Sequence, residues 1–125
     1  MYLLLTFSLL GCEKDRPLAY SSTLMGKWSW LFSCGGFAGC STPTTTNITR
    51  SLVLTEDSLS YYYENEVLQL SGPFSTRKII DQNQDTINLI SLYTSQEELS
   101  YTIKHDTLRL TTLNYLFDSG WKRIK

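Results

Sequence analysis

Apolar and polar residues alternate with a period of two along most of the chain after position 26. In the first such segment, Trp28, Trp30 and Phe32 occupy every second position. Alternation of this kind predicts half-buried antiparallel strands, and no segment keeps the 3.6-residue repeat of an amphipathic helix over three turns. The chain is therefore expected to be all-β.

Turn-forming residues separate the apolar runs along the rest of the sequence. The segments predicted as strands are residues 27–32, 48–55, 58–64, 67–70, 74–80, 87–93, 99–103, 108–110 and 120–125. Leu59, Tyr61 and Tyr63 share one face of their strand, whereas residues 87–93 are apolar on both faces and should be bent or buried on both sides. Eight or nine short strands joined by tight turns predict a small antiparallel up-and-down barrel, with a two-sheet sandwich as the alternative.

Composition limits the chain to one small domain. It has 125 residues, 42% of them hydrophobic, with 11 Lys and Arg against 12 Asp and Glu and no basic run, so we expect a monomer that does not bind nucleic acid. No Gly-x-Ser-x-Gly elbow, phosphate-binding Gly loop or metal-ligand cluster is present. His105 and Asp106 are adjacent at a predicted turn, where they are expected to be solvated. We therefore predict a protein that is not an enzyme and has no cofactor and no metal site.

The N-terminus has the pattern of an export signal. Residues 3–10 are largely apolar, too few to span a bilayer as a helix but sufficient for the apolar region of a signal peptide. The run ends in Leu9-Leu10-Gly11-Cys12, which resembles the bacterial lipobox. This resemblance implies a signal peptide over residues 1–11, lipidation of Cys12, a tether over residues 12–23 and a domain over residues 24–125. The protein would then be anchored to a bacterial membrane of the cell envelope, which we expect to be the outer membrane.

Cys34 and Cys40 are the two other cysteines. Export places them in an oxidising compartment, and lipidation of Cys12 would leave them as the remaining thiols. The three glycines between them give the loop the freedom to bring the two cysteines together. We predict a disulfide, because two cysteines and a distant His105 fall short of a zinc shell.

Gly26-Lys27-Trp28 at the start of the first strand resembles the Gly-x-Trp signature of the lipocalin and calycin barrels. The order of the later segments, which end in a basic strand, is similar to small lipocalin-like lipoproteins of Gram-negative bacteria. The resemblance implies a lipocalin-like barrel in which Gly26 and Trp28 form one end and Arg123, on the last strand, packs over the tryptophan. The chain is shorter than full-length lipocalins and lacks a helix before its last strand.

Two functions follow as hypotheses. The first is a barrel that binds a small apolar or amphipathic ligand. Its candidate lining residues are Trp30, Leu59, Tyr61, Leu99, Tyr101 and Leu108. The second is a filled barrel that contacts an envelope protein or a glycan through the loop of residues 34–46, with Phe37 as its candidate contact residue. The size of the space inside the barrel distinguishes the two.

Overall fold

The computed structural model describes residues 23–92 and 97–124 of the chain. Its strands are β1 (Gly26–Gly35), β2 (Cys40–Ser41), β3 (Arg50–Leu54), β4 (Leu59–Glu64), β5 (Val67–Ile80), β6 (Thr86–Leu92), β7 (Glu98–Lys104), β8 (Thr107–Thr112) and β9 (Phe117–Ile124). Helical structure in these residues is confined to a 3-10 turn, η3 (Gly36–Ala38), and one α-helical turn, α1 (Pro43–Thr46). The predicted signal peptide, Cys12 and all but the last residue of the predicted tether lie outside the described residues.

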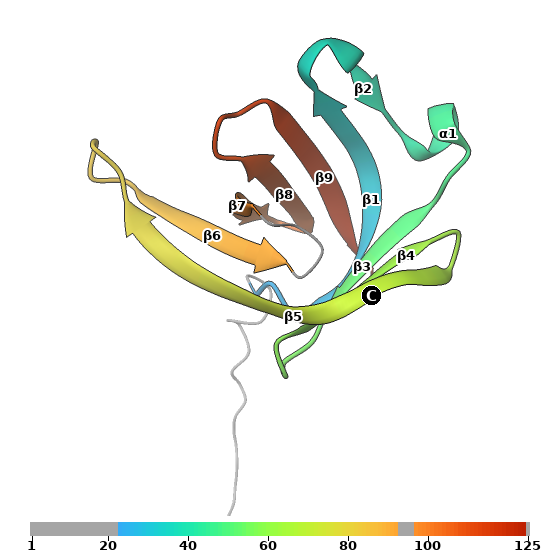
Figure 1. The fold of residues 1–125 in the computed structure, drawn as a ribbon, viewed down its shortest axis with the longest axis horizontal. Helices are drawn as coiled ribbons and strands as arrows, with labels where there is room; N and C mark the ends of the chain where they lie inside the picture. The colour runs from blue at the N-terminus through green and yellow to red at the C-terminus, as the bar shows by residue number, and fades with distance from the viewer. Residues whose placement is uncertain (1–22, 93–96, 125) are drawn as a thin grey trace, which may run out of the picture.

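The strands form a closed antiparallel barrel (Figure 1). Consecutive strands from β3 to β9 pair with each other, and β1 closes the ring by pairing with both β3 and β9. β2 is an extra short strand that folds back on the end of β1. The predicted all-β barrel is thus confirmed, and the sandwich alternative is excluded. Within the described residues, no helix is long and apolar enough to cross a bilayer.

One predicted strand boundary is wrong, because residues 67–80 form the single strand β5. The first part of β5 pairs with β4 as far as Pro73, and the second part pairs with β6 from Phe74 onward. Pro73 has no backbone N–H to donate, so it is tolerated at the point where the strand changes partner. The Gly-Pro pair therefore marks a change of partner instead of a turn.

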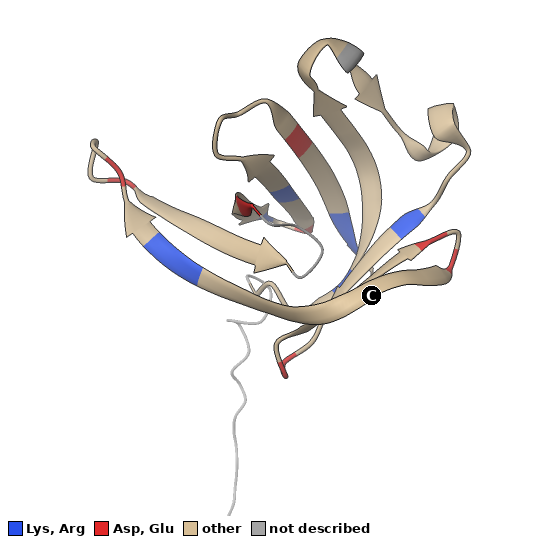
Figure 2. Cartoon of the chain, in the orientation of Figure 1, with Lys and Arg blue, Asp and Glu red and all other residues tan. Residues whose placement is uncertain are grey.

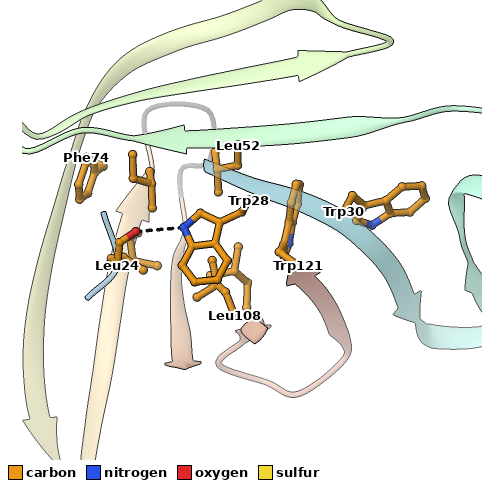
Figure 3. Packing of buried hydrophobic residues seen from close by; sticks show 10 residues of the cluster. Leu24, Trp28, Trp30, Leu52, Phe74, Leu108 and Trp121 are labelled. Carbon is orange, nitrogen blue, oxygen red and sulfur yellow. Dashed lines mark hydrogen bonds between the residues drawn. The ribbon is translucent and has the colours of Figure 1, made fainter. Parts of the chain in front are cut away.

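The core fills one end of the barrel and is dominated by tryptophans (Figure 3). Trp28, Leu54 and Leu108 are fully buried, and Trp30 and Trp121 pack beside them. β6 is buried on both faces, as predicted from its apolar pattern, since the adjacent residues Leu89 and Ile90 are both almost completely covered.

A β-bulge changes which side chains of β1 point into the barrel. Trp30 lies opposite Trp121 on β9, but the next pair is Phe32 with Gly120, so Leu31 is an extra residue on β1. Trp28 and Trp30 therefore face the core as the alternation predicts, whereas the ring of Phe32 lies against Gly120 on the outer face. The bulge lets β1 bend, which closure of a barrel requires.

Candidate functional site

One end of the barrel is closed by the pair that the lipocalin resemblance indicates. The guanidinium of Arg123 lies 4.3 Å from the centre of the Trp28 ring and donates hydrogen bonds to the carbonyls of Met25 and Thr23, at 2.9 and 2.7 Å. The indole Nε1 of Trp28 donates to the carbonyl of Leu24 at 3.0 Å, so both side chains hold the incoming chain against the barrel (Figure 3).

Gly26 makes this closure sterically possible. Its φ of 135° lies in a region that L-residues rarely adopt, and a Cβ at this position would come within 3.0 Å of Nη1 of Arg123. A side chain at position 26 would therefore strain the backbone and crowd the guanidinium that lies on the tryptophan. The Gly-x-Trp and Arg signature has a direct structural explanation in this barrel.

The opposite end of the barrel is open. A hollow of about 490 Å³ lies there, beside the end of β1 and the inner faces of β7, β8 and β9. Its lining includes Ser33, Leu99, Leu110, Thr112, Phe117 and Ser119. This volume falls within the range of roughly 300 to 1,000 Å³ that small-molecule sites occupy. The barrel is thus filled at one end and hollow at the other.

Hydrogen bonds hold two of the inner tryptophans in place below this hollow. Trp30 Nε1 donates to the hydroxyl of Ser33 at 2.8 Å, and Trp121 Nε1 donates to the hydroxyl of Ser119 at 2.9 Å. Both serines line the hollow. The two serine hydroxyls that line the hollow therefore also fix the indole rings of the core.

A charged pair lies on the inner face of β3 and β4 at the same end. The guanidinium of Arg50 stacks on Trp30 at 4.3 Å from the ring centre, and Arg50 Nε lies 3.3 Å from a carboxylate oxygen of Glu64. The hydroxyl of Tyr62 donates to the same oxygen at 2.7 Å. Burial, followed by this hydrogen bond to Glu64, raises the pKa of Tyr62 to about 12.

These charges are only partly buried. About a quarter of the Arg50 side chain and a third of the Glu64 side chain remain exposed. A guanidinium stacked on an indole ring keeps its edge available for hydrogen bonding. The inner wall therefore offers charged and polar groups to a molecule that enters the barrel.

The predicted lining residues fall on both sides of the barrel wall. Trp30 and Leu108 are in the buried core, Tyr101 packs against that core, and Leu99 packs against it and also lines the hollow. Leu59 and Tyr61 lie on the outer face, so their prediction as interior residues is wrong.

The residues of β4 that point into the barrel are the opposite set from the one that its apolar pattern indicates. Ser60 is buried and Tyr62 packs on the core, so the residues between them point outward. The inward polar groups have partners, because Ser60 donates to the carbonyl of Gly72 at 2.9 Å and Glu64 is paired with Arg50. Once these groups are satisfied, their burial is permitted, and the more apolar face is left outside.

Sequence reasoning missed Arg50, Tyr62 and Glu64. No local signal distinguishes them, because Arg50 and Glu64 become neighbours only through the register of β3 with β4. If the register were known, the opposite charges of Arg50 and Glu64 at paired positions would identify them as an interacting cross-strand pair.

The predicted disulfide is present. Cys34 and Cys40 are bonded and lie directly opposite each other in the β1–β2 pairing. Phe37, at the tip of the loop that they close, is fully exposed. In the described residues, no group of three His, Cys, Asp or Glu side chains is arranged to hold a metal ion.

His105 occupies the turn between β7 and β8 in a left-handed conformation, with φ of 58°. This position agrees with the expectation of a turn residue.

Comparison of the whole chain with protein-family models, curated proteins and solved structures finds no match.

Proposed function

We propose that the protein binds a small amphipathic molecule in the open end of its barrel. The observation that carries the proposal is the asymmetry of the interior, which is packed around Trp28 at one end and hollow at the other. Leu99, Leu110 and Phe117 would contact the apolar part of the ligand. A concave apolar wall with a few convergent polar groups is the usual form of a small-molecule site.

The polar groups near the hollow favour an amphipathic ligand over a purely apolar one. Ser33 and Ser119 line the hollow, and Arg50 and Glu64 face the same interior and are partly exposed. An entirely hydrocarbon ligand in the hollow would remove water from the hydroxyls of Ser33 and Ser119 and supply no hydrogen bond in its place, at a free-energy cost.

The cellular setting of this proposal is the bacterial envelope. The lipobox-like sequence ending at Cys12 supports it, together with the disulfide, which is typical of exported proteins. In this setting the lipid on Cys12 would anchor the barrel, and the ligand would come from the envelope.

Titration with the amphipathic fluorescent probe 1-anilinonaphthalene-8-sulfonate tests ligand binding. Leu99→Trp places a large ring in the hollow without removing a side-chain hydrogen bond, whereas Leu59→Trp places the same ring on the outer face of β4. We expect saturable binding by the wild type and by Leu59→Trp, and at least tenfold weaker binding by Leu99→Trp. Equal binding by both variants would contradict a site in the hollow.

A further inference from the structure

Five apolar side chains are exposed on two neighbouring turns at the open end. Phe37 has an exposed fraction of 110% and Tyr115 of 77%, and Leu113, Leu116 and Phe117 are each about half exposed. Exposed apolar side chains occur singly on most surfaces, but a group of this size marks an interaction site.

The two turns form one unit. Gly35 on β1 pairs with Phe117 on β9, and Gly36 N donates to the carbonyl of Leu116 at 3.1 Å. The disulfide between Cys34 and Cys40 fixes the base of the first turn. The apolar side chains are therefore held beside one another by backbone contacts.

Neither turn carries a charge. Residues 34–49 and 110–117 contain no Lys, Arg, Asp, Glu or His. Other described turns contain acidic residues, among them Glu56, Asp57, Glu66, Asp81, Asp85 and Asp106 (Figure 2). The absence of charge is thus a property of this pair of turns and not of the turns of this barrel in general.

The charged residues that flank the turns are paired. Asp118, which follows Phe117, binds Arg109. Glu98 accepts two hydrogen bonds from the guanidinium of Arg77, at 2.7 and 2.6 Å. These two pairs neutralise Asp118 and Glu98, and Glu97 is a further acidic residue beside Leu113.

Several backbone donors of the two turns have acceptors within the protein. Tyr115 N donates to the carbonyl of Thr112 at 2.9 Å, and Phe117 N donates to the hydroxyl of the same threonine at 3.1 Å. Gly36 N is satisfied by Leu116. These donors would therefore stay paired if the turns entered a membrane. An unpaired N–H group in an apolar medium is the main free-energy cost of such a transfer.

We propose that these two turns insert their apolar side chains into the interface of a lipid bilayer, through a contact that does not depend on lipid charge. Tyr115 has the amphipathic ring that is typical of the headgroup layer. Behind the tip of the first turn lies a neutral belt of hydroxyl groups that suits the same layer: Ser41, Thr42, Thr44, Thr45 and Thr46. A bilayer is fluid and accommodates the uneven relief of side chains that project by different amounts, whereas a protein partner needs a complementary patch of about 800 Å².

The contact is compatible with an anchor at Cys12. Thr23, the first described residue, lies at the closed end, where its carbonyl binds Arg123. The twelve residues from Cys12 to Thr23 reach about 40 Å when extended, which exceeds the roughly 33 Å length of the ten-residue strand β1. The anchor and the turns can therefore meet the same membrane.

Quenching of an introduced tryptophan by brominated lipid tests the proposal on the full chain. Tyr115→Trp reports on the second turn, and Asp57→Trp is the matched control on the β3–β4 turn at the closed end. The three native tryptophans are buried, so wild-type emission can be subtracted. The probe is vesicles of neutral phosphatidylcholine brominated on the acyl chains.

We expect at least twofold quenching of Tyr115→Trp, no quenching of Asp57→Trp, and no change between low and high salt. In the double variant that combines Phe37→Ser with Tyr115→Trp, the quenching should be at least threefold weaker. The double variant should still fold, because the side chain of Phe37 is fully exposed. Equal quenching at both positions, no quenching at either, or loss of quenching in salt would overturn the proposal. Concentration-dependent dimerisation without vesicles that Phe37→Ser abolishes would also overturn it, by showing that a second copy covers the turns.

Discussion

Replacing Leu108 or Leu59 by alanine removes the same atoms from opposite faces of the barrel wall. Leu108 has an exposed fraction of 0% and belongs to the tryptophan-rich core, whereas Leu59 is 37% exposed on the outer face of β4. The sequence pattern predicts both as interior residues, so the two variants test which of these side chains points into the barrel.

The expected costs differ because only one substitution leaves a cavity. At position 108 the loss of transfer free energy adds to a cavity that the surrounding rings cannot fill, and such changes cost about 2 to 5 kcal/mol. At position 59 water occupies the vacated space, and the substitution should cost about 1 kcal/mol or less.

Urea unfolding followed by tryptophan fluorescence measures both free energies of unfolding. With a slope of about 1 to 3 kcal/mol per molar urea, the Leu108→Ala midpoint should fall by at least about 0.7 M, and the Leu59→Ala midpoint should shift little. Equal losses for the two variants would refute the assignment of faces to β4 and β8.

Three further predictions follow from the structure. Arg123→Met should lower the free energy of unfolding by about 2 to 4 kcal/mol in urea melts, since it removes two hydrogen bonds from a charged donor and the contact with Trp28; a loss below 0.5 kcal/mol would count against the closure. The raised pKa of Tyr62 means that the unfolded state ionises first, so stability should fall from about pH 10 towards pH 12, and Tyr62→Phe should reduce that fall in alkaline melts; an unchanged pH dependence would contradict this reasoning. Reduction of the disulfide between Cys34 and Cys40 should leave the barrel folded by circular dichroism but speed proteolysis of the loop, because so short a ring contributes only about 2 to 3 kcal/mol; global unfolding on reduction would show that the barrel depends on it.

Local patterns were sufficient to predict the class of fold. Alternation and turn residues identify most of the strands, whereas the closure by Gly26, Trp28 and Arg123 is implied by the resemblance to lipocalins. The alternation and the turn signals act within one strand or one turn, so they can be read without knowing the register.

The interior of the open end was not predictable in the same way. The inward face of β4 depends on which polar groups find partners, and Arg50 meets Glu64 only across two strands. The bulge at Leu31 also reverses the facing of Phe32 without a glycine or proline to mark it. Each of these features is set by pairing between strands, which one sequence does not specify.

Native mass spectrometry of the protein purified from the cells that produce it tests ligand binding in the hollow most directly. Wild type and Leu59→Trp should carry a bound molecule of lipid or metabolite mass, and Leu99→Trp, which fills the hollow, should be recovered without it. The same bound mass on all three proteins, or on none of them, would contradict a ligand site at the open end of the barrel.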